Sequence, residues 1–263
     1  MIRIDSLTVR FGGVVPIDDM NVEMTAGVNG LIGPNGAGKT TFFNVLSGFV
    51  TPAAGSVTAF GDDLLAMQHF RRVRWGLRRT FQTEQAVAEL TVFENVLTVL
   101  EHSGTPASQR RDAVIDAVDF VGLGPMLNTE VGLLGAAERR LVEVARAVVG
   151  SPRLVLLDEP AAGLPDEETS ALGAVIKQIP ERTGALTILV DHDMDLVGDV
   201  CERVAVLDFG HVIASGETRA VLDDPRVMAA YLGDEEIDVE DHELEAASRD
   251  NSALADRIGG VES

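Results

Sequence analysis

The residues best suited to do chemistry lie in one stretch, residues 33–41, whose order fits the phosphate-binding pattern G-x-x-x-x-G-K-S/T. Glycines in such a loop let successive backbone N–H groups approach phosphate oxygens without a Cβ in the way. Lys39 would reach the β- and γ-phosphates of ATP, and the Thr40 hydroxyl would ligate Mg²⁺. We therefore expect a P-loop in which the nucleotide is bound by Gly33, Pro34, Asn35, Gly36, Ala37, Gly38, Lys39, Thr40 and Thr41.

The sequence around this loop agrees with that prediction. Residues 28–32 are a short, mostly apolar run typical of a buried strand, and residues 39–46 resemble the first turns of a helix that Ser47 and Gly48 would end. A phosphate would then lie at a helix N-terminus, where the helix dipole adds partial positive charge. A glycine-rich turn before a helix is the structural alternative, and the complete pattern in this context argues against it.

A second group of residues could complete the site. Leu154 to Leu157 form a continuous apolar run, typical of a central parallel strand that is covered on both faces. Asp158 follows at the end of this strand, where its carboxylate could hold Mg²⁺, and Glu159 could polarise the attacking water as general base. Two surface carboxylates that cap a strand are the alternative, but the P-loop upstream favours a site for ATP hydrolysis.

The composition limits the class of protein. The chain of 263 residues is long enough for one large domain or two subdomains, and its core must be aliphatic because aromatic residues make up only 5%. A formal charge of −21 argues against a nucleic acid as partner. Cys201 is the only cysteine, which excludes a disulfide within the chain, agrees with a reducing compartment and suggests a small buried apolar residue.

Two features of the sequence bear on a membrane location. Arg3 and Asp5 interrupt the N-terminus before any apolar run, so we expect no signal peptide. No apolar stretch reaches the roughly eighteen residues that a membrane span needs. If the protein works at a membrane, other chains must therefore span it.

The elements that must position these residues alternate along the chain. Residues 2–11 alternate as a strand, Thr91 and Glu94 form the capping box of a helix, and residues 204–207 and 212–214 predict a hairpin. Alternation of strands and helices predicts an α/β fold with a mostly parallel sheet. Further strands are expected at residues 21–24, 57–60, 78–81 and 187–190, and further helices at residues 69–76, 108–121, 136–149, 166–179 and 193–202, with two short helices near Tyr231.

Taken together, these motifs resemble the ATP-binding-cassette (ABC) ATPases over about residues 1–233. The resemblance implies a P-loop NTPase core with a mostly parallel sheet, an N-terminal antiparallel β subdomain and a helical subdomain at about residues 91–149. It also implies ATP and Mg²⁺ as cofactors, and two such subunits that close on ATP, head to tail, against two membrane-spanning permease chains. The protein would then be a peripheral subunit at the cytoplasmic face of the cell membrane.

Three further residues match positions to which this resemblance assigns a role. Phe11 matches the aromatic residue that stacks on adenine, with a core phenylalanine as the alternative. Gln82 matches the glutamine that links the nucleotide site to the membrane subunit, and we count it among both the catalytic and the metal-binding residues. His192 matches the histidine that contacts the γ-phosphate, where a hydrogen-bond donor stabilises transferred charge; a structural histidine is the alternative.

Two landmarks of the family differ in this sequence. The family's Leu-Ser-Gly-Gly-Gln signature, which acts in trans on the nucleotide of the partner subunit, corresponds to Leu134, Gly135, Ala136, Ala137 and Glu138. The serine hydroxyl is missing, two methyl groups are added and Glu138 brings a negative charge, so each change weakens phosphate binding. Pro165 also replaces the usual carboxylate or asparagine in the loop after Glu159. We therefore expect an impaired composite site and a similar but non-identical ATPase as partner.

Within the family, the sequence is most similar to the ATP-binding subunits of high-affinity branched-chain amino acid importers. The stretches that carry this similarity are residues 10–13, 79–82, 90–95, 157–164, 191–194 and 230–233. The similarity implies a subunit that hydrolyses ATP to power import of branched-chain or other hydrophobic amino acids, with urea or short amides as further candidates. One alternative is a subunit that binds ATP but hydrolyses it weakly, which the degenerate signature favours. Another is a soluble ABC protein of DNA repair or translation, which the single acidic cassette argues against.

Residues 234–263 lie outside this match and form an acidic C-terminal tail with eleven acidic residues and two arginines. Leu244, Ala247, Leu254 and Ile258 have loose helical spacing among the charges. We interpret the segment as a mobile tail or a frayed helix rather than as a functional arm.

Overall fold

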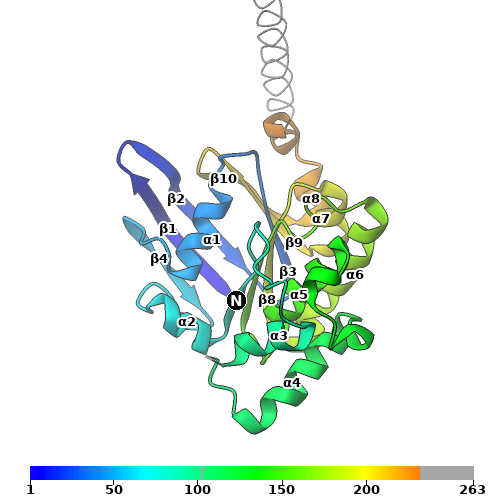
Figure 1. Ribbon diagram of the computed structural model, residues 1–263. Helices are drawn as coiled ribbons and strands as arrows, with labels where there is room; N and C mark the ends of the chain where they lie inside the picture. Colours follow the sequence, from blue (N-terminus) through cyan, green and yellow to red (C-terminus); the bar gives the residue numbers. More distant parts are fainter. Residues whose placement is uncertain (102, 232–263) are drawn as a thin grey trace, which may run out of the picture.

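The computed structural model describes residues 1–101 and 103–231, so the predicted acidic tail at residues 234–263 lies outside the described part of the chain. Within that part the strands form two sheets, and most of the helices pack on the side of the second sheet that faces away from the first (Figure 1). Among the described residues, no helix is long and apolar enough to cross a membrane.

The first sheet is antiparallel and is built from N-terminal residues in the order β2-β1-β4-β5. Its second strand begins at Val14, earlier than the pattern at residues 21–24 indicates. Irregular register between the first two strands, with Asp19 at φ 51°, breaks the alternation of buried and exposed residues on which the sequence prediction depended. The strands of this sheet are β1 (Ile2–Phe11), β2 (Val14–Met24), β4 (Ala54–Ala59) and β5 (Asp62–Asp63).

The second sheet has the order β10-β9-β3-β8-β7-β6, and its neighbouring strands are parallel except for the last hairpin, β9 with β10. Every residue of β3, β7 and β8 is buried, as expected of strands covered on both faces. The predicted α/β class with a mostly parallel sheet is therefore confirmed. The strands are β3 (Val28–Ile32), β6 (Leu77–Arg79), β7 (Leu154–Asp158), β8 (Leu186–Val190), β9 (Arg203–Asp208) and β10 (His211–Glu217).

The two faces of the second sheet belong to two different hydrophobic cores. Leu154 and Leu156 of β7 face the antiparallel sheet, whereas Val155 and Leu157 face the opposite side. Helix α1 (Lys39–Ser47), which follows the predicted P-loop, belongs to the first of these cores through Phe42, Phe43, Val45 and Leu46. Because α1 is packed with strands of both sheets, the loop that precedes it is held firmly.

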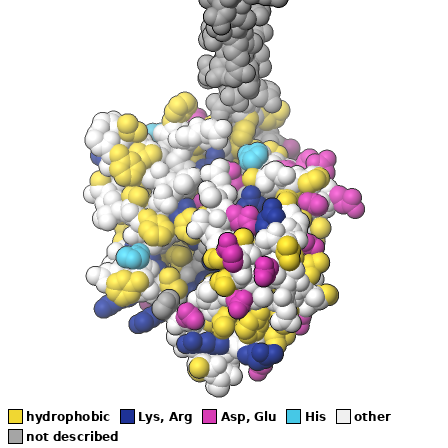
Figure 2. Space-filling model, viewed as in Figure 1, with side chains coloured by type: hydrophobic (Ala, Val, Ile, Leu, Met, Phe, Trp, Pro, Cys, Tyr) yellow, Lys and Arg dark blue, Asp and Glu magenta, His cyan; other side chains and the backbone are white. Residues whose placement is uncertain are grey.

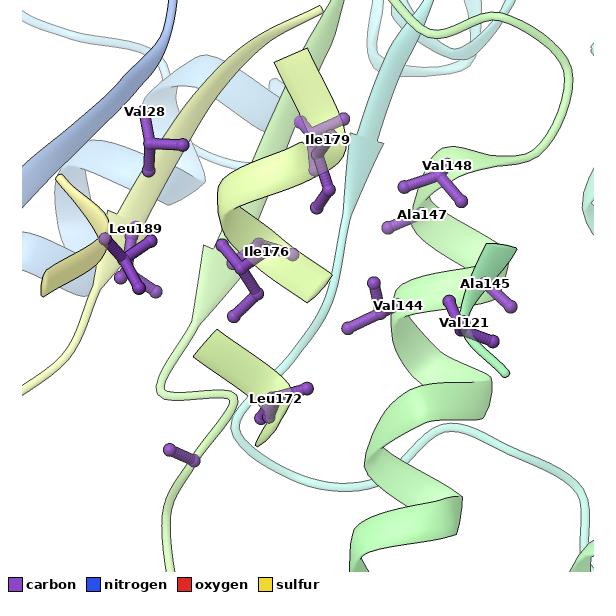
Figure 3. Packing of buried hydrophobic residues seen from close by; sticks show 14 of the residues in the cluster. Val28, Val121, Val144, Ala145, Ala147, Val148, Leu172, Ile176, Ile179 and Leu189 are labelled. Carbon is purple, nitrogen blue, oxygen red and sulfur yellow. The ribbon is translucent and has the colours of Figure 1, made fainter. Parts of the chain in front are cut away.

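The remaining helices cover the other face of the second sheet through aliphatic side chains. Figure 3 shows Leu172, Ile176 and Ile179 of α6 between the sheet residues Val28 and Leu189 and the side chains of α5. These helices are α3 (Val92–Leu100), α4 (Ala107–Phe120), α5 (Ala136–Val148), α6 (Asp166–Thr183), α7 (Met194–Val200) and α8 (Thr218–Leu222), with η1 (Gly124–Met126) and η2 (Val131–Leu133); α2 (His69–Trp75) lies beside the first core.

Local signals set the ends of several helices. The predicted capping box of α3 is confirmed, because the Glu94 carboxylate accepts a hydrogen bond from the Thr91 N–H at 2.9 Å and the Thr91 hydroxyl accepts one from the Glu94 N–H at 3.2 Å. Helix α6 continues beyond its predicted end at residue 179, to Thr183, although Pro180 lies in its last turn. Gly184 then ends the helix in the left-handed conformation, at φ 73°.

Candidate functional site

The loops that carry the predicted site residues leave the same edge of the parallel sheet. The predicted P-loop follows β3, Gln82 follows β6, Asp158 ends β7 with Glu159 next to it, and His192 follows β8. Because β3, β8, β7 and β6 are neighbouring parallel strands, their carboxyl ends lie together. This is the edge at which open α/β sheets bind ligands.

The glycines of the predicted P-loop divide into two kinds. Gly33 and Gly38 have φ values of 149° and 110°, and a Cβ at either would lie 2.0 Å from the Leu207 carbonyl oxygen or 2.2 Å from the Pro16 carbonyl oxygen. Only glycine can therefore close the loop against the strands behind it. Gly36, at φ 79°, has no other heavy atom within 4 Å of the position of a Cβ. Its open side is where an anion can approach the backbone.

The start of α1 suits an anionic ligand. Gly38 precedes the helix without a side-chain cap, so the first helical N–H groups donate no hydrogen bond to a capping side chain. The Lys39 ammonium lies within the loop, where it donates to the carbonyl oxygen of Pro34 at 2.8 Å and to that of Gly33. Thr40, at the surface, and the half-buried Thr41 follow. The residues present therefore fit a nucleotide's phosphates.

Asp158 is a buried carboxylate with two fixed contacts. Its side chain is 5% exposed, Oδ2 accepts a hydrogen bond from Nη2 of Arg79 at 2.8 Å, and its backbone N–H donates to the hydroxyl of Thr80 at 3.0 Å. Burial raises the pKa of the Asp158 carboxyl above its usual value, while Arg79 and Lys39 act in the opposite direction. A carboxylate and the Thr40 hydroxyl are oxygen donors of the kind that Mg²⁺ uses beside substrate phosphates, so the donor set fits the metal.

Glu159 has an unusual backbone. Its φ of 46° lies in the left-handed region, which costs a non-glycine residue about 1–3 kcal/mol and is typical of functional sites. Its N–H donates to the carbonyl oxygen of Val190 at 2.8 Å, which ties the end of β7 to the end of β8. Its carboxylate accepts a hydrogen bond from Nε2 of Gln82 at 2.9 Å. The structure therefore brings two of the predicted catalytic residues into direct contact.

The loop after β8 is organised by Asp191, a residue that the sequence analysis did not single out. Its Oδ1 accepts hydrogen bonds from the N–H groups of His192 at 2.8 Å and Asp193 at 3.1 Å, which turns the chain so that the His192 side chain is exposed. Asp191 is only 1% exposed, and burial raises the pKa of its carboxyl. A carboxylate directly after a buried apolar strand was the available signal.

Arg79 is the second residue that the sequence analysis missed as part of the site. It ends β6, and its guanidinium reaches across to Asp158 on the neighbouring strand. A buried arginine next to a strand that ends in a carboxylate could not be paired with it before the strand order was known.

Phe11 and Cys201 differ in their exposure to solvent. Phe11 ends β1 and is 53% exposed, so the alternative of a core phenylalanine is wrong; its role in stacking on adenine stays a prediction. Cys201 is buried, as predicted, and burial raises the pKa of its thiol to about 12. That thiol is therefore protonated and unreactive at neutral pH.

The degenerate signature lies at the exposed start of α5. Gly135 is the N-cap, Leu134 is buried beneath the turn, and Ala136, Ala137 and Glu138 form the first helical turn. The Glu138 carboxylate accepts a hydrogen bond from the Gly135 N–H at 2.7 Å. Gly135 has no side chain that could accept a hydrogen bond from the Glu138 N–H, so only half of a capping box forms. The helix N-terminus thus already holds an anion of its own chain.

A parallel sheet with a glycine-rich loop before α1 and two carboxylates at the end of a central strand defines an α/β P-loop nucleotide-binding protein. Residues 17–162 match the family described as "ABC transporter", and residues 211–237 match the one described as "Branched-chain amino acid ATP-binding cassette transporter". The chain belongs to the ABC transporter family and is an ATPase of that family.

Curated relatives agree with this membership. The chain is 35% identical over 251 residues to the high-affinity branched-chain amino acid transport ATP-binding protein BraF of Pseudomonas aeruginosa and 34% identical to LivG of Salmonella typhimurium. It is 33% identical over 236 residues to the lipopolysaccharide export system ATP-binding protein LptB of Acidithiobacillus ferridurans. Each comparison covers 89% of this chain and 98% of the relative.

Solved structures show the same fold. The ADP conformation of MJ1267, an ATP-binding cassette of an ABC transporter, is 26% identical with a TM-score of 0.79 and covers 89% of this chain and 98% of its own. A nucleotide-free ATP-binding cassette from an ABC transporter is 26% identical with a TM-score of 0.77, covering 88% and 98%. The predicted resemblance is therefore confirmed, and the chain is the ATP-binding subunit of an ABC transporter.

Proposed function

We propose that this subunit binds and hydrolyses ATP to power an importer of branched-chain or other hydrophobic amino acids, with urea or short amides as further candidates. Support comes from the relatives named for branched-chain amino acid transport and from the family match at residues 211–237. The relative named for lipopolysaccharide export is slightly less similar. The observation that carries the hydrolytic role is the contact between Glu159 and Gln82 beside Asp158, at the sheet edge that also carries the P-loop.

In this proposal the chain's own residues divide the work. The P-loop backbone and Lys39 bind the phosphates of ATP, and Phe11 stacks on adenine. Thr40, Asp158 and Gln82 are the residues that would hold Mg²⁺, which when bound neutralises charge on the phosphates.

Glu159, Gln82 and His192 carry out the chemical step in this proposal. Glu159 accepts the proton of the water whose oxygen bonds to the γ-phosphorus as the bond to the β-phosphate oxygen breaks. Gln82 orients the Glu159 carboxylate through its hydrogen bond. His192 donates a hydrogen bond to a γ-phosphate oxygen and stabilises the charge that is transferred.

The proposed partner on the membrane side is a permease chain, with this subunit peripheral at the cytoplasmic face. Phe49, His69, Phe70 and Phe81, here called the aromatic surface, lie together, with ring centroids 6.3 Å apart for Phe49 and Phe81 and 5.7 Å apart for His69 and Phe70. Phe49 is 60% and Phe70 50% exposed. Figure 2 shows hydrophobic side chains around a histidine on the side of the molecule that carries α2, with basic side chains next to them.

A groove of about 610 Å³ adjoins this surface and is lined by Met67, His69 and Phe70 among others. Arg71 and Arg74 are exposed on the same helix, α2. Aromatic side chains flanked by arginines suit a permease segment with apolar residues and acidic neighbours. Because Phe81 directly precedes Gln82, a segment bound here would lie close to the residue that contacts Glu159.

The second proposed partner is another ABC ATPase, non-identical to this chain, that closes on ATP head to tail. The degenerate signature supports this, because Glu138 at the start of α5 would oppose a phosphate there. A functional second signature on the partner would complete the site built from this chain's P-loop.

Glu159→Gln in this chain tests the proposed hydrolytic role. We expect ATP hydrolysis by the assembled membrane complex to fall by about 10²-fold or more, since a general base contributes 10²–10⁴-fold. The matched control is Glu168→Gln, which removes an exposed carboxylate from the first turn of α6. Uptake of labelled leucine against labelled urea by the same complex in vesicles tests the substrate.

A second candidate function is a subunit that binds ATP but hydrolyses it weakly. The self-capped start of α5 favours it, because this contact occupies a helix N-terminus with a carboxylate. Under that alternative, Glu159→Gln would leave hydrolysis by the complex nearly unchanged, and the general-base assignment would be wrong.

A further inference from the structure

Arg79 is a buried cation that the proposed catalytic steps do not use. Its side chain and that of Asp158 are each 5% exposed, and Nη2 of Arg79 donates to Oδ2 of Asp158 at 2.8 Å. Asp158 is the carboxylate expected to hold Mg²⁺. One oxygen of the predicted metal ligand is therefore paired with a cation of the chain itself.

The remaining contacts of Arg79 tie it to the P-loop helix. Nη1 donates to the side-chain oxygen of Asn44 at 2.8 Å and to that of Ser47 at 3.2 Å, both on α1. Nε is buried and has no hydrogen-bond partner among the described residues.

Arg79 also contacts the aromatic surface. Its guanidinium carbon lies 4.8 Å from the ring centroid of Phe81, and the rings of Phe81 and Phe49 are 6.3 Å apart. Phe49 is 60% exposed. A single side chain therefore joins an exposed aromatic surface on one side to the buried carboxylate of the nucleotide site on the other.

We propose that the Arg79 guanidinium, which is paired with Asp158, competes with Mg²⁺ for this carboxylate. The affinity of the site for Mg²⁺ then depends on how the aromatic surface packs against Arg79. The proposal rests on the proposed function. Two cations close to one carboxylate repel each other, so metal binding and the Arg79–Asp158 pair oppose one another. A partner that changes the packing of Phe49 and Phe81 changes how firmly Arg79 is held on Asp158. Arg79 is thus a positioning residue that links docking to metal affinity.

The test uses the full chain and a fluorescent N-methylanthraniloyl derivative of ATP, whose binding is followed while Mg²⁺ is titrated. In Arg79→Met we expect the half-saturating Mg²⁺ concentration to fall by about tenfold, because a hydrogen bond between charged groups contributes roughly that factor. Arg79→Lys keeps a cation beside Asp158 but loses the planar guanidinium, so the half-saturating Mg²⁺ concentration should fall less than in Arg79→Met.

Arg78→Met is the matched control. Arg78 lies on the same strand and is also buried, but its guanidinium donates to the backbone carbonyls of Val73 and Leu77, at 2.8 and 3.0 Å, and has no hydrogen bond to Asp158 among the described residues. Its loss should leave the Mg²⁺ dependence unchanged even if the thermal midpoint falls. Circular dichroism establishes that each variant is folded.

Two results separate the possible failures. If Arg79→Met binds the nucleotide with the wild-type Mg²⁺ dependence, the competition does not exist and this inference is overturned, while the proposed function stands. If the wild-type chain binds no nucleotide at any Mg²⁺ concentration, the proposed function fails and this inference with it.

If Arg79→Met does not fold, a second variant tests whether Arg79 competes with Mg²⁺ for Asp158. Phe81→Leu keeps both charges and removes one of the two rings beside the guanidinium, while the ring of Phe43 stays. We expect its half-saturating Mg²⁺ concentration to fall by about threefold, the size of a partly exposed cation–π contact. An unchanged value would overturn the link between the aromatic surface and Asp158.

Discussion

At the scale of single residues, burial sets the electrostatics of the site. Asp158 and Asp191 end neighbouring strands, both are nearly inaccessible to water, and burial raises the pKa of each carboxyl. They differ in their partners. Asp158 has Arg79 beside it, whereas Oδ2 of Asp191 has no hydrogen-bond partner among the described residues. The ionised form of Asp191 is therefore stabilised mainly by backbone N–H groups.

Asp191→Asn should change how stability depends on pH. The folded pKa of Asp191 lies above its ordinary value of 3.8, so the native state keeps its proton where the unfolded chain loses it. The free energy of unfolding contributed by Asp191 therefore falls as pH rises from 3.8 to the folded pKa, by at most about 1.4 kcal/mol per pH unit. The asparagine variant lacks this loss, so its stability relative to the wild type should improve from pH 4 to pH 7.

Chemical denaturation at a series of pH values measures this effect. Asp199→Asn, which removes an exposed carboxylate from α7, is the control and should show no such trend. Parallel curves for wild type and Asp191→Asn would show that Asp191 titrates normally in the folded protein.

Part of the site could be predicted from residues that are neighbours in sequence. The P-loop pattern predicted residues 33–41, and the apolar run before Asp158 and Glu159 predicted a buried strand that ends at the sheet edge. Sequence spacing could not predict the Arg79–Asp158 pair, since 79 positions separate the two residues and only the pairing of β6 with β7 brings them together. The left-handed backbone of Glu159 was equally hidden, because nothing in a glutamate predicts a positive φ.

At the scale of elements, the start of α5 shows how a changed motif can keep its helix. Gly135 has φ −67° and ψ 168°, ordinary for an N-cap, and the atom nearest to an added Cβ would be Oε2 of Glu138 at 3.5 Å. A serine therefore fits at this position without moving the backbone. The absence of the serine hydroxyl at residue 135 is therefore a change of side chain and not a change of backbone conformation.

The double variant Gly135→Ser with Glu138→Gln should restore part of a phosphate-binding signature, since Ala136 and Ala137 keep their methyl groups. The stability of the fold should change by only a few tenths of a kcal/mol, since glycine and serine differ little as N-caps. ATP hydrolysis by the assembled complex should rise, because the negative charge is gone and a hydroxyl donor is added. Glu130→Gln removes an exposed charge at the start of η2 and serves as the control. Unchanged hydrolysis in the double variant would mean that this signature does not limit turnover.

At the scale of the whole molecule, hydrophobic side chains gather on the side that carries α2 (Figures 1 and 2), and Phe49 and Phe70 of the aromatic surface are among the exposed ones. Within the described part of the chain, the aromatic surface is connected to the nucleotide site by both Arg79 and Gln82. The proposed docking surface and the proposed hydrolytic residues are therefore neighbours, so coupling between them would need no long pathway.

Phe49→Ser combined with Phe70→Ser should weaken assembly with the permease by about tenfold or more, as expected when aromatic anchors of an interface are lost. At saturating Mg²⁺, nucleotide binding by the isolated subunit should stay as in the wild type, because neither residue belongs to the P-loop that binds the phosphates. Phe209→Ser changes an aromatic residue that is 85% exposed on the turn between β9 and β10 and is the control. Co-purification from detergent and fluorescence titration are the two measurements; equal recovery of all variants would move the docking site elsewhere.

The closure of the P-loop by distant strands has a consequence for biosynthesis. The loop packs against the Leu207 carbonyl oxygen, the carbonyl oxygen of Ala37 accepts a hydrogen bond from the N–H of Gly210 at 3.1 Å, and β3 lies between β8 and β9. A chain made from its N-terminus onwards has its phosphate-binding sequence early, yet the neighbours that shape it are translated more than 160 residues later. During translation the nascent chain therefore carries an unformed nucleotide site until the hairpin of β9 and β10 has left the ribosome. ATP can stabilise the folded chain by binding only at that late stage.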